Sequence, residues 1–186
     1  MSITSRSFRD TMGRFATGVA VIAVRGGEER HTGEVHAMTA SSLTSVSLDP
    51  PLLLFCVSRT AKMAALLEAS DGFTINLLRA DQRALSAFFA GQWRGAAAPP
   101  FRFVPWSIGV RLEGCAASLG CAVHRIDQAG DHWIVLGEVR DLHNGVEPVS
   151  PLVFFGGRYA ALSEERSDVA PEPLREEPIV QVFYER

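Results

Sequence analysis

The sequence predicts a mainly β protein, an antiparallel barrel with helices laid outside it. Short apolar runs bounded by turn residues outnumber the segments with helical periodicity. No regular alternation of strands with crossover helices, which is typical of parallel sheets, is present. No Gly-x-Gly-x-x-Gly motif follows a predicted strand, so any nucleotide has to bind without the Rossmann fingerprint.

The composition is that of a soluble globular protein with one domain. The chain has 186 residues, of which 47% are hydrophobic and 21% charged, and its net charge of −3 gives no long-range attraction to nucleic acid or anionic membranes. The apolar run at residues 18–24 is too short for a signal or membrane helix. Three cysteines without a Cys-x-x-Cys pair indicate neither a disulfide framework nor a zinc site. We therefore expect a reduced, cytoplasmic protein.

The first elements are an amphipathic helix and a β hairpin. Ser5 or Ser7 can cap the helix, and Gly18 is placed to end it. Its apolar residues recur at helical spacing and are Phe8, Met12 and Phe15. Residues 19–24 form the first predicted strand, and a return strand follows at residues 31–38.

A hydroxyl-rich stretch leads from this hairpin to a rigid corner. Six serines and threonines fall within residues 39–47, and Asp49-Pro50-Pro51 precedes a buried strand at residues 52–57. Such a polar ledge at the edge of a core suits a ligand with several acceptors, such as a phosphate or a heterocycle. The alternative is structural, because hydroxyls also bond to nearby backbone and favour turns.

The middle of the chain alternates helices and strands. Thr60 is the predicted cap of a second helix, which Gly72 closes, and residues 73–78 form a strand. Asp81 is the predicted cap of a third helix, which ends at Gly91. Residues 91–105 then read as a loop long enough for a functional flap or for disorder.

The second half is dominated by hairpins. Residues 110–126 and 132–142 predict one long hairpin, and residues 151–155 and 158–162 predict a short one. We therefore assign residues 1–163 to the barrel domain. Residues 164–186 are an acidic, proline-containing tail of net charge −4, in which residues 179–184 can dock as an edge strand.

Two further segments carry polar residues suited to ligands. Arg59, Thr60 and Lys62 begin the second helix, where basic side chains and free N–H groups suit a phosphate; the alternative is a capped helix with solvated charges. His132 follows Gly130-Asp131 at a strand entry and can point from the barrel rim toward a ligand. Neither the histidines nor the cysteines have the spacing of a metal site.

Several phrases occur in an order that resembles the flavin reductase-like family. These are Phe8-Arg9, Phe15-Ala16-Thr17-Gly18-Val19, Met38-Thr39-Ala40-Ser41-Ser42, Ser45-Val46-Ser47-Leu48-Asp49-Pro50-Pro51 with Cys56-Val57, Phe88-Phe89-Ala90 and Gly130-Asp131-His132. The resemblance covers residues 8–162. It implies a Greek-key, FMN-binding split barrel, usually homodimeric, that serves as the reductase component of two-component flavin-dependent monooxygenases.

The resemblance also implies roles for individual residues. His132 is expected to be catalytic and to lie near the reduced nicotinamide together with Asp131. Arg59, Thr60 and Lys62 are expected at the flavin phosphate. The remaining flavin-binding positions implied are Met38, Thr39, Ala40, Ser41, Ser42, Ser45, Val46, Ser47, Cys56 and Phe89.

The predicted activity is hydride transfer from NADH or NADPH to FMN or FAD, with reduced flavin then supplied to a partner monooxygenase. Position, exclusion of water and donors for the developing charge suffice for this reaction, so no side-chain nucleophile is required. Two alternatives stay open. One is a flavin oxidase similar to pyridoxamine-phosphate oxidase, and the other is a non-catalytic, dimeric flavin-binding module.

Overall fold

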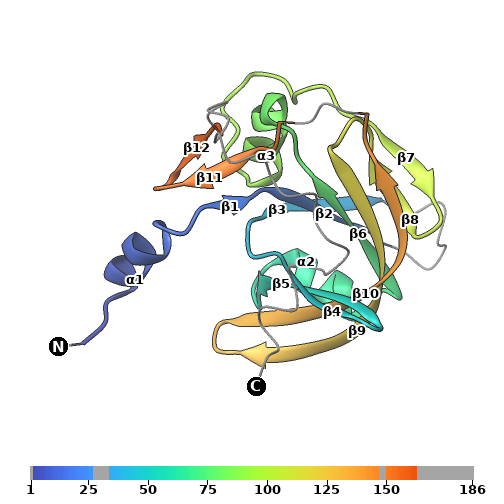
Figure 1. Cartoon of the computed structure of the whole chain (residues 1–186), viewed down its shortest axis with the longest axis horizontal. Helices are drawn as coiled ribbons and strands as arrows, with labels where there is room; N and C mark the ends of the chain where they lie inside the picture. The colour runs from blue at the N-terminus through green and yellow to red at the C-terminus, as the bar shows by residue number, and fades with distance from the viewer. Residues whose placement is uncertain (1, 27–33, 147–149, 163–186) are drawn as a thin grey trace, which may run out of the picture.

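The computed structural model describes residues 2–26, 34–146 and 150–162. Its centre is a seven-stranded antiparallel sheet of order β3-β2-β6-β9-β10-β5-β4 (Figure 1). These strands are β2 (Ala20–Arg25), β3 (Val35–Ala40), β4 (Thr44–Leu48), β5 (Pro51–Ser58), β6 (Gly72–Leu77), β9 (Ala117–Ala129) and β10 (His132–Asn144). The predicted fold class, mainly antiparallel β with flanking helices, is confirmed.

The two edge strands of this sheet are consecutive in the chain, which curls the sheet into a barrel. β3 and β4 lie at opposite edges, yet only residues 41–43 separate them. Four residue steps from Ala40 to Thr44 span at most about 14 Å. The edges must therefore approach each other although they do not pair, as in a split barrel.

The barrel interior is filled by alternate residues of the long strands. In β5, Leu53, Phe55 and Val57 are buried, and the residues between them face the other side of the sheet. Phe55 packs edge-on against Phe73 with ring centroids 5.2 Å apart. Gly137 makes room for this pair, because a Cβ there would lie 2.4 Å from the Phe73 ring.

Helices and short hairpins cover the barrel. α2 (Lys62–Glu68) buries Met63 and Leu67 in the core, and α3 (Arg83–Phe89), which follows the 3-10 turn η1 (Ala80–Gln82), packs against β3. The small strands outside the main sheet are β1 (Thr17–Gly18), β7 (Phe103–Trp106), β8 (Gly109–Leu112), β11 (Val153–Phe155) and β12 (Arg158–Ala160). β11 pairs with both β1 and β12.

α1 (Ser5–Met12) stands apart from the barrel (Figure 1). None of its residues is buried, and the predicted apolar residues Phe8 and Met12 are 60% and 51% exposed. Phe15, just beyond the helix, is 70% exposed. The predicted amphipathic helix therefore forms, but among the described residues of this chain none buries its apolar side.

Three predicted helix caps are wrong. Thr4 caps α1 by accepting from the Ser7 N–H (3.1 Å), and the helix ends at Gly13, well before Gly18. Thr60 bonds to Ser58 through its hydroxyl, so α2 begins after Ala61 without a side-chain cap. Asp81 pairs with the Arg79 guanidinium. Each competing partner is a near neighbour that the pattern alone does not rank.

The second half contains one division that the sequence did not predict. Residues 110–126 form two strands, β8 and β9, because the chain reverses at Gly114, whose φ is +75°. Pro105 lies within β7 rather than in the preceding loop. His31, the first predicted turn and residues 164–186 lie outside the described residues. In the described part of the chain, no helix has the length and apolar character needed to cross a membrane.

Candidate functional site

The hydroxyl-rich stretch forms the end of β3, the loop at residues 41–43 and the start of β4. Thr39 Oγ1 donates to the Ser86 carbonyl oxygen (2.8 Å), which ties β3 to α3. Ser42 Oγ accepts from the Cys56 N–H (2.9 Å) and donates to the Cys56 carbonyl oxygen (3.3 Å). These two hydroxyls therefore bond to the backbone, as the structural alternative expects. The remaining lone pairs of these two hydroxyl oxygens can still accept a hydrogen bond from a ligand.

A β bulge lies in the second predicted phrase, Ser45-Val46-Ser47. Ser45 pairs with Leu53 and Ser47 with Leu52, so Val46 is the extra residue on β4. A bulge bends its strand and changes the direction of the adjacent side chains. Ser45 is exposed and Ser47 is half-buried, so both remain within reach of solvent and of a ligand at the barrel edge.

A pocket of about 450 Å³ lies between this stretch and the N-terminal segment. One wall contains Ser41, Ser42 and Thr44, and the other contains Met12, Phe15 and Phe154. Polar groups facing apolar and aromatic side chains fit a flat heterocycle with acceptors along one edge. The wall formed by Met12, Phe15 and Phe154 was not predicted, although Phe15 belongs to a phrase that the resemblance uses.

His132 lies at the first position of β10, directly after the turn that contains Gly130, whose φ is +63°. His132 Nδ1 and Asp131 Oδ1 are 2.8 Å apart. The hydrogen bond to His132 and the attraction of its ring hold the pKa of the Asp131 carboxyl below its usual range, and Arg9 adds to this. With Nδ1 engaged, Nε2 is the ring nitrogen left for a ligand.

The strand register places one strand, β5, between His132 and the hydroxyl-rich stretch. His132 pairs with Ser58, and Ile134 pairs with Cys56, in adjacent strands β10 and β5. Directly opposed residues share a face of the sheet, and so do residues two apart on one strand. His132 and Cys56 therefore lie on one face of the sheet, and Ser42 bonds to the Cys56 backbone at the edge of β5.

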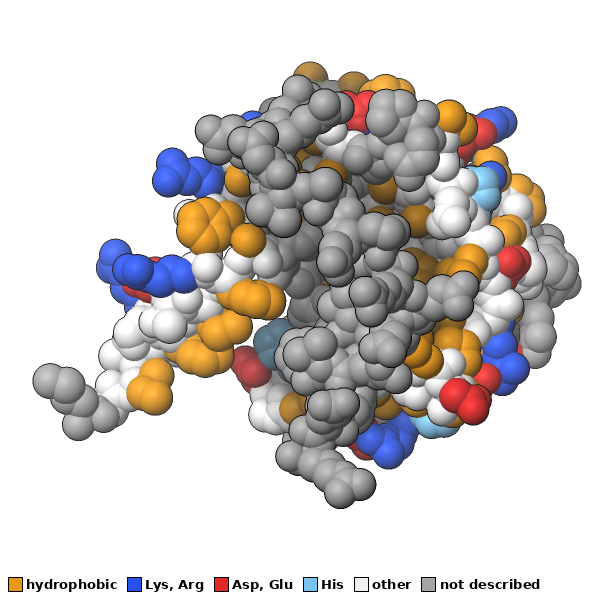
Figure 2. All heavy atoms as spheres, viewed as in Figure 1, with side chains coloured by type: hydrophobic (Ala, Val, Ile, Leu, Met, Phe, Trp, Pro, Cys, Tyr) orange, Lys and Arg blue, Asp and Glu red, His pale blue; other side chains and the backbone are white. Residues whose placement is uncertain are grey.

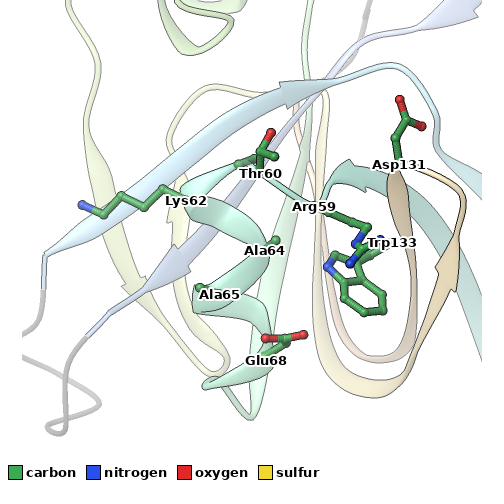
Figure 3. A pocket seen from close by; sticks show the side chains of 9 residues that line it. Arg59, Thr60, Lys62, Ala64, Ala65, Glu68, Asp131 and Trp133 are labelled. Carbon is green, nitrogen blue, oxygen red and sulfur yellow. The ribbon is translucent and has the colours of Figure 1, made fainter.

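A second pocket, of about 650 Å³, lies beside α2. Its lining includes the predicted residues Arg59, Thr60, Lys62 and Asp131, with Trp133 and Glu68 in addition. The Arg59 guanidinium lies over the Trp133 ring, 5.4 Å from its centroid, and the Arg59 N–H donates to the Asp131 carbonyl oxygen (3.1 Å). In Figure 3 the Glu68 carboxylate points from the last turn of α2 toward Trp133, whereas Lys62 extends away from it.

Trp133 and Glu68 were missed because no motif contains them. Trp133 follows the Gly-Asp-His phrase directly, but a tryptophan in a strand is ordinarily a core residue. Glu68 lies on the exposed side of a helix, where charges are expected. Only the tertiary structure, in which α2 contacts β5 and β5 pairs with β10, brings the two residues to one pocket.

Neither pocket is lined by the predicted residues Met38, Thr39, Ala40, Ser45, Val46, Ser47, Cys56 and His132. Phe89 also lies apart from both pockets. It packs against Phe101 and Phe103, with ring centroids 5.0 and 6.0 Å away, and it lines neither pocket. Phe88 belongs to the same aromatic cluster. Among the residues described, no group of three or more His, Cys, Asp or Glu side chains has the arrangement of a metal site.

The fold is an antiparallel split barrel, and its two pockets are candidate ligand sites. Comparison with known proteins gives the family. The model described as "Flavin reductase like domain" matches residues 12–163. The chain belongs to the flavin reductase-like family, as the sequence phrases predict.

The relatives cover most of the chain. The 4-hydroxyphenylacetate 3-monooxygenase reductase component of Thermus thermophilus is 39% identical over 84% of this chain and 95% of its own. An NADH-dependent flavin reductase of a Rhodococcus species is 39% identical over 86% of this chain and 88% of its own. The Streptomyces globisporus NADH:FAD oxidoreductase, solved with NAD and FAD fragments, is 32% identical with a TM-score of 0.76, over 89% of this chain and 99% of its own.

Proposed function

We propose that the protein is an NAD(P)H:flavin oxidoreductase that reduces FMN or FAD and supplies the reduced flavin to a partner monooxygenase. The observation that carries the proposal is the shared face of β5 and β10, which carries His132 and Cys56, with Ser42 bonded to the Cys56 backbone at the edge of β5. The curated relatives named above are reductases, one of them a monooxygenase component. They favour this activity over an amine oxidase or a non-catalytic module.

The pocket beside Ser41 and Ser42 is the proposed flavin site. Its lining combines the polar residues Ser41, Ser42 and Thr44 with the apolar side chains of Met12 and Phe15, which suits the polar edge and the flat face of the ring. A bound flavin supplies the ability to accept a hydride from a reduced nicotinamide. Donors close to the ring oxygen and nitrogen atoms stabilise the negative charge that reduction places there.

His132 is the proposed nicotinamide contact, and Asp131 is its orienting partner. The hydrogen bond between Nδ1 and the accepting Asp131 carboxylate orients the ring and keeps Nε2 for the ligand. NADH is the proposed donor, because relatives bear names such as NADH-dependent flavin reductase. Arg59, Thr60 and Lys62 are assigned to phosphate groups at the end of β5.

The activity is tested by mixing the purified protein with NADH and free FMN or FAD, then following nicotinamide absorbance at catalytic protein concentration. Turnover that saturates with added flavin supports the reductase. Absence of turnover with both NADH and NADPH would favour a binding module, and amine-dependent oxygen consumption would favour an oxidase.

His132→Ala is expected to raise the nicotinamide KM with little change in flavin Kd. An unchanged nicotinamide KM would remove His132 from the site.

We also propose that the protein is a homodimer located in the cytoplasm. The support for the dimer is the uncovered apolar side of α1 (Figure 2), where Phe8 and Met12 are 60% and 51% exposed. The support for the location is the three free cysteines. Light scattering after size exclusion is expected to give twice the chain mass. Phe8→Glu is expected to shift the protein toward monomer, whereas Leu142→Glu, at an exposed site on β10, is not. A monomeric wild type would contradict the dimer, and fractionation of cells tests the location.

A further inference from the structure

The two edges of the main sheet differ in how they are covered. At one edge, the helices α2 and α3 both contact β3, and a helix over an edge strand is a common way to protect it. At the other edge, β4 pairs with β5 alone among the described strands. Thr44, Ser45 and Leu48 are exposed there, and Leu48 is an apolar residue at 58% exposure. The outer edge of β4 can therefore accept a further strand.

The smaller strands in the described part of the chain suit a six-residue partner less well. β1 has two residues and β12 has three, so neither offers a full ladder. β7 contains Pro105, which has no N–H to donate, and β8 contacts β2 and β6 of the main sheet. β4 has five residues and is longer than any of these four strands.

The C-terminal tail contains one segment with the composition of a strand. Residues 179–184, which lie outside the described residues, read Ile-Val-Gln-Val-Phe-Tyr. Five of the six are β-branched or aromatic, Pro178 precedes them, and the charged pair Glu185-Arg186 follows. An exposed segment of this kind favours aggregation, and so does an exposed sheet edge. Pairing the segment with β4 removes both hazards.

The connection between the barrel and this segment starts near β4 and is long enough to return along it. Tyr159 pairs with Phe154, and Phe154 lines the proposed flavin pocket together with Thr44, the first residue of β4. The sixteen residues 163–178 then span at most about 55 Å when extended. A domain of this size is smaller than that in diameter, since its radius of gyration is about 16 Å.

The charge of the tail complements the opposite wall of the proposed flavin pocket. Residues 164–186 carry a net charge of −4. Residues 5–15 supply Met12 and Phe15 to that wall, and they hold three exposed arginines and one exposed aspartate, a net charge of +2. Opposite charges attract over a Debye length of about 8 Å at physiological ionic strength. This attraction favours a tail that lies beside the pocket.

We propose that residues 179–184 pair with the outer edge of β4 in the same chain and compete there with the flavin. The pairing depends only on the sheet edge and the tail. The competition rests on the proposed function, because Ser45, Val46 and Ser47 are expected at the flavin and Thr44 lines the proposed flavin pocket. Groups that face a docked strand cannot bind flavin at the same time. A tail that returns to β4 therefore favours release of the flavin to a partner.

Hydrogen–deuterium exchange of the full chain, followed by mass spectrometry, measures the pairing without flavin. In the wild type we expect residues 179–184 to be protected about tenfold more than residues 163–170. The test variant is the double substitution Val180→Pro/Gln181→Pro. Neighbouring residues point their N–H groups to opposite sides of a strand, so one of the two prolines removes a ladder bond in any register. Exchange is expected to rise about tenfold in residues 179–184 and at the outward-facing amides of residues 44–48.

The matched control is Val169→Pro/Ala170→Pro, which places the same two substitutions in the linker and is expected to leave both segments protected. Unchanged protection of residues 52–57 demonstrates that the barrel of each variant is folded. Unprotected residues 179–184 in the wild type, or unchanged exchange of β4 in the double variant, would overturn the pairing. Protection that disappears on dilution would assign the strand to a second copy and overturn the pairing within one chain.

Titration calorimetry with FMN tests the competition. A ligand's apparent Kd rises as the fraction of competent molecules falls, so a tail docked in about 90% of molecules weakens FMN about tenfold. We therefore expect Val180→Pro/Gln181→Pro to bind FMN about tenfold more tightly than the wild type and the linker control. Saturating FMN should also raise the exchange of residues 179–184 in the wild type.

The outcomes separate this inference from the proposed function. An FMN Kd that is equal in the wild type and the double variant would overturn the competition, even in an active reductase. Tighter FMN binding by the double variant of a protein that never oxidises NADH or NADPH would retain the inference and refute the reductase.

Discussion

Replacing Asn76 by leucine tests a heavily bonded polar group that is buried between the main sheet and β8. Asn76 is completely buried in β6. Its Oδ1 accepts from the Leu112 N–H (2.8 Å) and from the Ser118 hydroxyl (3.0 Å), and its Nδ2 donates to the Val21 carbonyl oxygen (3.1 Å). The side chain therefore joins β6 to β2, β8 and β9, and Asn76→Leu removes every one of these bonds at similar volume.

The expected loss follows from the groups left without partners. A buried donor or acceptor that loses its bond costs about 1–3 kcal/mol, and the substitution affects two donors and one carbonyl. The Ser118 hydroxyl can rotate toward another acceptor, so we expect a total loss of about 2–5 kcal/mol. Because a domain of this size is stable by about 5–15 kcal/mol, this is a large fraction of the whole.

Urea unfolding followed by tryptophan fluorescence measures the change. Wild type and variant are compared at one protomer concentration, because association would make stability concentration-dependent. Asn144→Leu, at an exposed position of β10, is the matched control and is expected to stay within about 0.5 kcal/mol of wild type. A loss below about 1 kcal/mol for Asn76→Leu, with an unchanged m value, would refute the reasoning.

Two further predictions concern groups near the flavin site. Tyr159→Phe removes the donor to the buried Ser86 hydroxyl (2.9 Å), and we expect a loss of about 1 kcal/mol by urea unfolding. It should also weaken FMN binding by two- to threefold, because the Ser86 backbone holds the predicted flavin segment; unchanged FMN affinity would contradict that link. Burial raises the pKa of the Cys115 and Cys121 thiols to about 12, so at pH 8 both stay protonated and unreactive. Iodoacetamide should therefore label only Cys56 in the folded protein, and more slowly with FMN bound, as detected by mass spectrometry. Rapid labelling of Cys115 or Cys121 would contradict their burial in the structure.

Local patterns predicted most of the strands. The apolar run at residues 52–57 and the runs at 19–24 and 132–142 became β5, β2 and β10 because burial on at least one face requires such residues. Helix ends were predicted less well. Thr4, Ser5 and Ser7 are all competent caps by residue type, and only the local geometry selects Thr4.

The candidate site was predicted in parts. The phrases that contain Cys56 and His132 lie on two distant segments, and the pairing of β5 with β10 brings these two residues to one face. Phe89 shows the limit of this reasoning, because its motif is compatible both with a ligand contact and with an aromatic cluster. The neighbouring Phe101 and Phe103, which no local pattern connects to α3, place it in the cluster.

The sequence by itself determined the class of this protein: the strand periodicity, the absence of a Rossmann motif, and the ordered phrases of a flavin reductase-like chain. Those signals are local, since each depends on residues within one turn or one strand. The tertiary structure alone decided which strands became the free edges of the barrel, that Met12 and Phe15 face Ser42, and that Arg59 and Trp133 share a pocket with Glu68. These facts depend on contacts between segments far apart in the chain, whose closeness is set by register and packing rather than by the residues of either segment.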